Sequence, residues 1–440
     1  RSEQLLNAVD YDMFLKLSEV CSFYHINQKL YLRRIHGKNT SVINEKKQDD
    51  NTLIVITYAL ERMKLAKVWE VYSPDPTMPR KVAFRKKEQM QIFFYPDYRK
   101  SNTYQSLLYS CLAKKYSCCD GTIEDALEAS RDAPGLVIFH LHWTLNILAT
   151  AKTCMEAEKC KNIFLNKMFE FLSLGGSLIW TIHNALPHKC EYLKQEIELR
   201  NILAQAAQKI HIHSKQSIPE IEKYIKLPLD KIQISPHGNY VDAYPNTVER
   251  KTARGHFGFS PKETVFLFLG QIRYYKGVDL LLEAFAKVNK IYPQTRLVIA
   301  GKPVDAIDRN NFHFSTEVLN SVLFVEKYIP GDELQLYFNS ADAVVLPYRK
   351  ILTSGSVLLA LSFSRPVIAP KCGMIEEVIQ NGYNGFIYEP ERIDLLVQAM
   401  SQVVNLKLED KEKLYEQSIH SVLNLSWDRI AQDIYQQFSN

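Results

Sequence analysis

The 440-residue sequence lacks the motifs by which several large protein classes are identified. It has eight cysteines but no C-x-x-C pair. That pattern predicts idle or buried thiols in a reducing compartment rather than a disulfide framework or a zinc site. Neither G-x-G-x-x-G nor a Walker loop follows a predicted strand, which disfavours a nicotinamide oxidoreductase. No helix or zinc motif supports binding of nucleic acid.

Long apolar runs are also missing. No segment reaches the roughly 18 residues needed to cross a bilayer. We therefore expect a cytoplasmic protein, with a peripheral position at the inner face of a membrane as its only membrane contact. The first residue is Arg1 instead of Met, so we expect the chain to be a piece of something longer.

The charge is mild but unevenly distributed. A formal net charge of +5, with 46% hydrophobic and 23% charged residues, is typical of a globular protein. The positive surplus gathers at Arg80, Lys81, Arg85, Lys86 and Lys87. A solvated surface is the first interpretation of this stretch, and contact with an anionic membrane or an acidic acceptor is the alternative.

The first region of the chain, residues 1–88, carries no recognisable chemistry. Its patterns predict helices over residues 12–37 and 51–72, followed by the Pro-rich break SPDPTMPRK. We interpret this helical segment as the end of a longer upstream region.

From Gln89 onward, apolar strand-like runs alternate with helical patterns, which predicts an α/β fold with mostly parallel sheets. MQIFFYPDY, GLVIFHLHW, GGSLIWTIHN and QKIHIHS are strands of a first domain, residues 89–245. After the linker ISPHGNYVDAYP, a second series runs from VFLFLG through TRLVIAGKP, SVLFVEKYIP, ADAVVLPYR, RPVIAP and NGFIYEP. It forms a second domain, residues 246–425, and a last helix covers 426–440.

The stretch VFLFLGQIRYYKG, which ends at Gly277, carries the clearest chemistry. Its apolar run predicts a strand buried on both faces, and LLLEAFAKVNK predicts a helix after the turn. Arg273 and Lys276 therefore sit at the carboxyl end of a parallel strand, where open α/β sheets bind ligands and a helix N-terminus offers N–H donors. These features predict a diphosphate site, and a solvated pair of cations is the alternative.

These blocks, in this order and spacing, resemble the retaining nucleotide-sugar glycosyltransferases of the GT-B fold, in particular glycosyltransferase family 4. The resemblance is strongest from Phe266 to Pro390 and continues into LSWDRIAQDIYQQF, but it does not extend before Gln89. It implies two doubly wound Rossmann-like domains facing a cleft. It also implies a terminal helix that crosses back to the first domain.

The resemblance assigns the donor site to the second domain. Arg273 and Lys276, with Gly270 before them, match the family's clamp on the donor diphosphate. Relatives carry two glutamates where this chain has Ile351 and Leu359, and no carboxylate lies between Ala343 and Pro370. The small residues at the start of the next predicted helix remain as donor contacts: Thr353, Ser354, Gly355, Ser356 and Val357. An ordinary serine N-cap is the alternative.

In the first domain, His183 matches the histidine at a strand end that, in this family, faces the transferred sugar. We name it with Arg273 and Lys276 as the catalytic residues, and His237 of the linker as a further donor contact. His140 and His142 are two apart and so point to the same side of a strand. No third metal ligand accompanies these two histidines. Their remaining interpretations are contact with the acceptor or packing in the core. The acceptor-binding prediction names Asp97, Tyr98, Tyr104, His142 and Asn184.

The predicted function is sugar transfer from a nucleotide diphosphate sugar to a hydroxyl of a glycan or lipid-linked saccharide, in polysaccharide or glycoconjugate biosynthesis. The resemblance implies retention of anomeric configuration, with no metal and no cofactor beyond the donor co-substrate. Two alternatives stay open. One is a sugar-nucleotide epimerase of similar architecture, and the other is a catalytically silent carbohydrate-binding module of a larger synthase.

Overall fold

The structure is a computed structural model that describes Lys16 and residues 45–63, 69–72, 82–86, 90–100, 102–187, 190–305 and 315–436. It divides into two compact units, Arg1–Met90 and Gln91–Asn440. Apart from Lys16, the predicted helix over 12–37 lies outside the described residues, as do Arg80, Lys81 and Lys87.

The first unit combines a helix with a small sheet. Helix α3 (Glu45–Arg62) ends earlier than the sequence predicted, because residues 69–72 are extended. They form β1 (Trp69–Tyr72), which pairs antiparallel with β2 (Ala83–Lys86). The prediction of one helix over 51–72 is therefore wrong for residues 69–72, and residues 64–68 lie outside the described residues. The β-forming residues of WEVY find a partner strand there, and such pairing overrides a local helical pattern.

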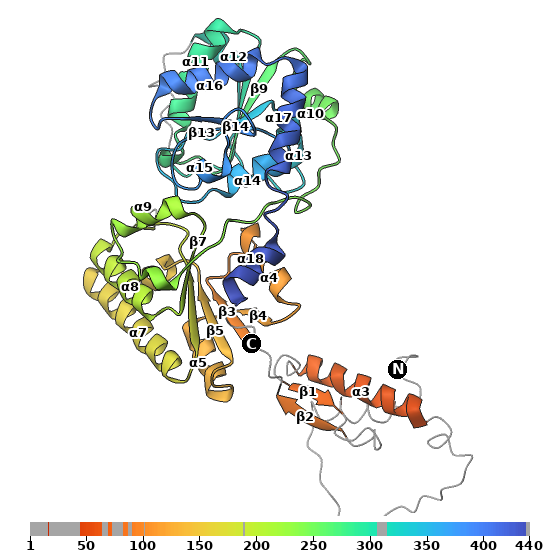
Figure 1. The fold of residues 1–440 in the computed structure, drawn as a ribbon, viewed down its shortest axis with the longest axis vertical. Coiled ribbons are helices and arrows are strands. Elements are labelled where there is room, and N and C mark those ends of the chain that lie inside the picture. The colour runs from red at the N-terminus through yellow and green to blue at the C-terminus, as the bar shows by residue number, and fades with distance from the viewer. Residues whose placement is uncertain are drawn as a thin grey trace, which may run out of the picture. The chain divides into compact units, whose positions relative to one another are not determined.

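The second unit contains two six-stranded sheets (Figure 1), and every pair of neighbouring strands in them is parallel. The first sheet has the order β4-β3-β5-β6-β7-β8. Its strands are β3 (Gln91–Tyr95), β4 (Ser117–Asp120), β5 (Val137–Leu141), β6 (Ser177–Thr181), β7 (Lys209–Ile212) and β8 (Ile232–Ile234). Strands β5 and β7 are buried along their whole length, which explains their continuous apolar character.

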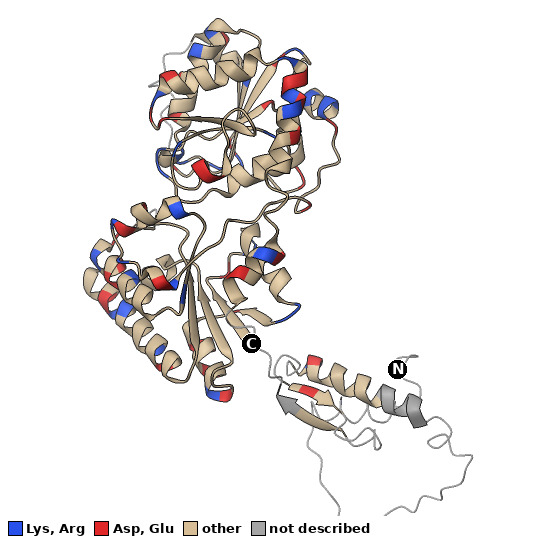
Figure 2. Ribbon diagram, in the orientation of Figure 1, with Lys and Arg blue, Asp and Glu red and all other residues tan. Residues whose placement is uncertain are grey.

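Helices connect these strands and cover the sheet. They are α4 (Thr103–Leu112), α5 (Ile123–Asp132), α6 (Leu145–Leu148), α7 (Cys154–Ser173), α8 (Leu193–Ala206) and α9 (Ile218–Glu222), with the short 3₁₀ turns η2 (Lys215–Ser217) and η3 (Leu229–Lys231). In Figure 2 the ribbon segments coloured for charged residues lie mainly on helices, and the strands carry few. That distribution is the expected one when the sheet is covered on both faces.

The second sheet has the order β11-β10-β9-β12-β13-β14. Its strands are β9 (Thr264–Leu269), β10 (Thr295–Ala300), β11 (Val322–Val325), β12 (Ala343–Val345), β13 (Val367–Pro370) and β14 (Gly385–Tyr388). The accompanying helices are α10 (Arg250–His256), η4 (Tyr274–Lys276), α11 (Val278–Ile291), α12 (Thr316–Asn320), α13 (Leu334–Ser340), α14 (Gly355–Ser362), α15 (Ile375–Val378), α16 (Ile393–Asn405) and α17 (Leu408–His420).

In both sheets, the direction in which successive strands are added reverses beside the first strand. In the second sheet β10 and β11 lie on one side of β9 and β12 lies on the other, and in the first sheet β4 and β5 flank β3 in the same way. The loops after β9 and β12 therefore diverge at the carboxyl edge of the sheet. In doubly wound folds this is the place where ligands bind.

The last helix, α18 (Trp427–Tyr435), follows the second sheet in sequence but packs on α4 of the first domain (Figure 1). Ser426 caps its N-terminus, and Trp427, Ile430, Ile434 and Tyr435 are buried. Among the described residues, no helix is both long enough and apolar enough to cross a membrane.

Candidate active site

The turn after β9 carries the two predicted cations. Gly270 follows the strand with a φ of 148°, and Gly277 ends η4 with a φ of 68°, a left-handed conformation that glycine adopts at little cost. A Cβ on Gly277 would lie 1.9 Å from the carbonyl oxygen of Pro347. The turn therefore packs directly against the loop after β12, and only glycine fits at this contact.

Lys276 lies at the centre of this region. A Cβ built on Gly270 would be 3.0 Å from Lys276 Nζ and 3.8 Å from Ser356 Oγ, so all three residues meet at one point. Burial, and secondarily the charge of Arg273, lower the pKa of Lys276 to about 8. Arg273 is partly exposed and its Nε donates to Gln271 Oε1 at 3.0 Å. Two cations in a partly dry site favour a ligand that carries negative charge.

The N-terminus of α14 supplies the small residues that the sequence singled out. Ser354 Oγ accepts a hydrogen bond from the Val357 N–H at 3.4 Å and lies 2.9 Å from the Tyr348 hydroxyl. Ser354 is therefore the N-cap of this helix and is itself buried. Thr353 and Ser356 stay partly exposed. They are the hydroxyls of this turn that remain open to a ligand.

His237 connects the linker to this helix. Its Nδ1–H donates to the Gly238 carbonyl at 2.7 Å, and its Nε2 lies 3.4 Å from the Tyr240 hydroxyl. A Cβ on Gly355 would lie 2.8 Å from that hydroxyl and 3.6 Å from His237 Nε2. The linker thus packs against the first residue of α14, beside the predicted donor site.

A histidine cluster lies at the carboxyl end of the first sheet, where β5, β6 and β7 are neighbours. Its members come from these strands, the residues directly after them and the linker: His140, His142, His183, His211, His213 and His237. Centroids of contacting rings lie 4.1–5.5 Å apart. Burial lowers the pKa of every member, to about 4 for His211 and His237. The cluster is therefore neutral at pH 7.

Tyr104 of α4 packs into the middle of this cluster. Its ring contacts those of His142, His183, His213 and His237 at centroid distances of 5.0–5.9 Å. Tyr104 is 1% exposed, and its hydroxyl has no hydrogen-bond partner, nor has either ring nitrogen of His213. His142 is equally buried. Acceptor contact by Tyr104 and His142 stays a prediction, and in this conformation both pack as core residues.

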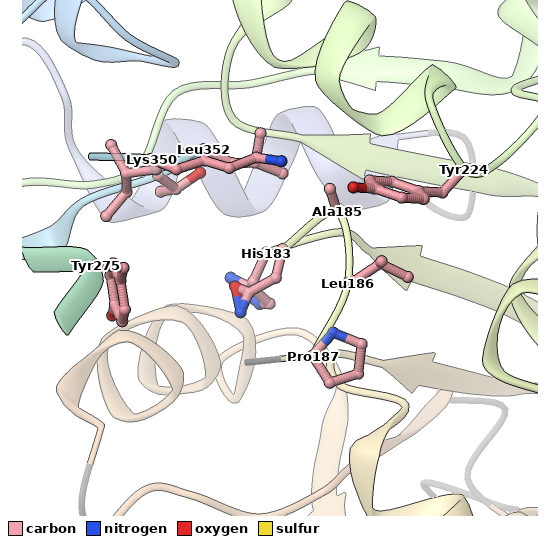
Figure 3. Close-up of a pocket in the computed structure, with 11 residues that line it drawn as sticks. His183, Ala185, Leu186, Pro187, Tyr224, Tyr275, Lys350 and Leu352 are labelled. Carbon is pink, nitrogen blue, oxygen red and sulfur yellow. The ribbon is translucent and has the colours of Figure 1, made fainter. Parts of the chain in front are cut away.

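His183 is the member of the cluster that reaches a pocket (Figure 3). This pocket has a volume of about 220 Å³ and combines residues of both domains. Its lining residues are His183, Asn184, Ala185, Leu186, Pro187, Tyr224, Tyr275, Lys350, Ile351, Leu352 and Thr353. His183 and Asn184 thus share one cavity with Thr353 from the opposite domain. The catalytic, acceptor and donor roles of these residues stay predictions.

The two domains also touch directly around this pocket. Lys350 Nζ lies 3.4 Å from Glu220 Oε2, and the Ser217 hydroxyl donates to the Leu352 carbonyl at 3.4 Å. The Gln216 N–H donates to Glu377 Oε1 at 3.1 Å. These contacts join η2 and α9 of the first domain to the loop after β12 and to α15 of the second.

The other predicted acceptor residues lie on the first domain. Asp97 is exposed and pairs with Arg99 Nε at 2.9 Å, which lowers the pKa of this carboxyl. The Tyr98 hydroxyl donates to Asn146 Oδ1 at 2.8 Å. Asn146 in turn lines a second pocket of about 270 Å³, which shares Pro187 with the first.

Sequence reasoning missed most of the residues that line the first pocket, among them Tyr224, Tyr275 and Lys350. Only Tyr275 carried a signal, since it lies between the two predicted cations. In the described part of the chain no group of three or more His, Cys, Asp or Glu side chains has the geometry of a metal site.

Known proteins resemble this chain in both sequence and fold. Residues 249–421 match the family described as Glycosyl transferases group 1. The chain is 26% identical over 306 residues to the GDP-mannose:glycolipid 4-beta-D-mannosyltransferase of Xanthomonas campestris, covering 68% of this chain and 79% of that protein. It is 24% identical over 283 residues to the lipopolysaccharide 1,2-N-acetylglucosaminetransferase of Salmonella typhimurium, covering 59% and 72%.

Among solved structures, HepE of Anabaena in complex with UDP-glucose covers 80% of this chain and 100% of its own, with a TM-score of 0.60 at 13% identity. Together with the two parallel sheets, this similarity confirms the predicted GT-B fold.

Proposed function

We propose that this chain is a retaining glycosyltransferase that moves a sugar from a nucleoside diphosphate sugar to a hydroxyl of a glycan or glycolipid acceptor. The observation that carries the proposal is the convergence of Lys276, Arg273 and the start of α14 at the carboxyl edge of the second sheet. The curated relatives support the acceptor class, because one is named for a glycolipid acceptor and the other for lipopolysaccharide.

In this proposal the cations act on the leaving group. A departing nucleoside diphosphate gains negative charge in the transition state, and fixed positive groups in a partly dry site stabilise that charge. Lys276 Nζ and Ser356 Oγ lie beside Gly270, where the ammonium group would contact an oxygen of a bound diphosphate. Arg273 adds the second positive charge.

The acceptor proton needs no protein carboxylate on this route. If the diphosphate leaves from the face that the acceptor approaches, its own oxygen takes the proton of the attacking hydroxyl. The first pocket fits this scheme, because none of the described residues that line it is Asp or Glu. His183 then borders the reacting centre, and the second pocket, beside Tyr98 and Asn146, is the proposed place of the acceptor.

The decisive experiment measures nucleotide release from UDP-, GDP-, CMP- and dTDP-sugars, with and without candidate acceptors and in excess EDTA. We expect release with one donor, increased by acceptor and unaffected by EDTA. Conversion of the sugar without release would support an epimerase instead. A folded protein that neither releases nucleotide nor converts the donor would be a silent module.

Variants link this activity to the proposed clamp. Removing one preorganised charge of this kind costs about 10²–10³ in rate, so Arg273→Ala and Lys276→Ala should lose turnover while staying folded. Lys287→Ala is the matched control, because Lys287 is exposed in the same domain and pairs with Glu283 on the same helix. Near wild-type rates in the Arg273→Ala/Lys276→Ala double variant would refute the assignment.

A further inference from the structure

A continuous chain of hydrogen bonds runs inward from His183. His183 Nε2 lies 3.0 Å from His142 Nδ1, and His142 Nε2 lies 2.6 Å from the Tyr109 hydroxyl. His140 Nδ1 then contacts two hydroxyls, that of Tyr109 at 2.8 Å and that of Tyr435 at 2.6 Å. The chain thus links the pocket to helix α18.

The inner end of the chain fixes the direction of its donors. The Ser235 carbonyl only accepts, so His211 Nε2, 3.0 Å away, carries a proton and donates to it. His211 is neutral, so its Nδ1 accepts from the Thr181 hydroxyl at 3.1 Å. The Thr181 hydroxyl has one proton, which it donates to His211, so its oxygen accepts a hydrogen bond from His140 Nε2–H at 2.7 Å. His140 Nδ1 is therefore an acceptor that needs one hydroxyl donor.

Two tyrosines compete for that position, and the outcome decides the state of His183. Tyr109 has one proton and its hydroxyl also contacts that of Tyr435. In the first arrangement Tyr435 donates to His140, and Tyr109 donates to His142 Nε2 rather than to Tyr435. His142 then carries its proton on Nδ1 and donates it to His183 Nε2. If Tyr109 donates to His140 instead, every bond from Tyr109 to His183 reverses. Both arrangements use the contact between Tyr109 and His142, and the first is favoured because His140 Nδ1 lies nearer to the Tyr435 hydroxyl, at 2.6 Å, than to the Tyr109 hydroxyl, at 2.8 Å.

Two neighbouring aromatic rings also fix the orientation of the His183 imidazole. It stacks on Trp143 at a centroid distance of 4.3 Å with an interplanar angle of 14°, and the edge of Tyr104 lies 5.0 Å away. With Nε2 occupied by His142, Nδ1 is the ring nitrogen left to meet a ligand in the pocket.

We propose that Tyr435, Tyr109 and His142 are positioning residues that hold His183 in the tautomer with its proton on Nδ1. His183 thereby presents a hydrogen-bond donor to an oxygen of the bound substrate. This inference rests on the proposed function for its kinetic consequence, but the tautomer itself is a property of the protein without substrate. Tyr435 acts from a helix that lines neither pocket described above.

The tautomer is measurable directly by imidazole ¹⁵N NMR of the full chain, with the His183 signals assigned from their loss in His183→Gln. In the wild type we expect a proton on Nδ1 only. Tyr435→Phe removes the donor to His140, so Tyr109 replaces it, the outer bonds reverse, and the His183 proton moves to Nε2. Tyr337→Phe is the control, because Tyr337 is 4% exposed in the second domain, outside the chain of hydrogen bonds.

A proton on Nε2 in the wild type, or an unchanged tautomer in folded Tyr435→Phe, would overturn the proposal. Tyr109→Phe gives a second test, because it disconnects His142 and should leave His183 as a mixture of tautomers. If the wild type transfers sugar, Tyr435→Phe should lower kcat about tenfold with little change in the donor KM, since the buried network stays intact except for one donor. If the protein transfers no sugar at all, the NMR result still decides the tautomer while the proposed function fails.

Discussion

Lys276 is the residue whose ionisation should be visible in kinetics. Its pKa of about 8 in the free protein means that the ammonium form is lost as pH rises above that value. A bound diphosphate favours the charged form and moves the pKa upward. We therefore expect kcat/KM to fall about tenfold per pH unit above pH 8, and the corresponding limb of kcat to lie at higher pH.

Lys276→Arg is the informative variant for this profile. Arginine keeps its charge throughout the accessible range, so the alkaline limb of kcat/KM should disappear even if the rate is lower. A limb that stays at the same pH in Lys276→Arg would assign the titration to another group.

The histidine cluster makes a second prediction, about acid stability. Its members have folded pKa values below the ordinary histidine value near 6.5, down to about 4 for His211 and His237. Between these values the unfolded chain binds protons that the folded chain does not, so stability is complete above about pH 6.5 and falls as pH drops toward 4. Each histidine contributes a slope of about 1.4 kcal/mol per pH unit within that window.

Urea unfolding at several pH values between 7.5 and 5 measures this slope. His213→Phe should reduce it by the share of one histidine, because neither nitrogen of His213 has a hydrogen-bond partner to lose. His420→Gln, on the exposed end of α17, should leave it unchanged. If the midpoint of urea unfolding of the wild type does not change between pH 7.5 and 5, the description of a neutral buried cluster is wrong.

At the scale of elements, the turn of η4 is set by one glycine. Gly277→Ala places a Cβ 1.9 Å from the Pro347 carbonyl oxygen in addition to the strain of its left-handed φ. Gly382 is the matched control, with a φ of 75° and nothing within 4 Å of its Cβ position. We expect Gly382→Ala to cost about 1 kcal/mol. Gly277→Ala should cost more and also lower activity, because Lys276 is the preceding residue.

Thermal unfolding and nucleotide release of the two variants separate these effects. Equal destabilisation of both would show that the contact between η4 and the loop after β12 relaxes without cost.

How far the sequence predicts these elements depends on the range of the interactions that form them. The long apolar run of β9 predicted a buried strand and, in the turn after it, the position of Arg273 and Lys276. The edge strand β4, with sequence SCCD, has no such pattern and was not predicted. The same holds for β1, which exists because β2 pairs with it.

The site shows the same division. His183 was predicted, because a strand end is a local feature. The histidine cluster was not predicted as a unit, since it forms only when β5, β6 and β7 are placed side by side by the order of the sheet. Pocket residues such as Tyr224 and Lys350 come from opposite domains, and no local pattern pairs them.

At the scale of the whole molecule, the described parts of both sheets and every lining residue of the first pocket belong to the unit Gln91–Asn440. We predict that removing residues 1–88 leaves donor-dependent nucleotide release within about twofold of the full chain, because a compact unit with its own core can fold alone. The measurement compares the two proteins at equal concentration after their folding is verified by circular dichroism. A folded but inactive fragment would show that the first unit contributes to the reaction.

Helix α18 has a consequence for biosynthesis. The hydroxyl of Tyr435 reaches His140 across 295 positions of the chain. A ribosome therefore synthesises the first sheet long before it supplies the helix that covers α4 and completes the interior around the histidines. Until then the nascent first domain exposes an apolar surface, so its maturation waits for translation of nearly the entire second domain. Prematurely terminated chains should therefore be substrates for chaperones and proteases.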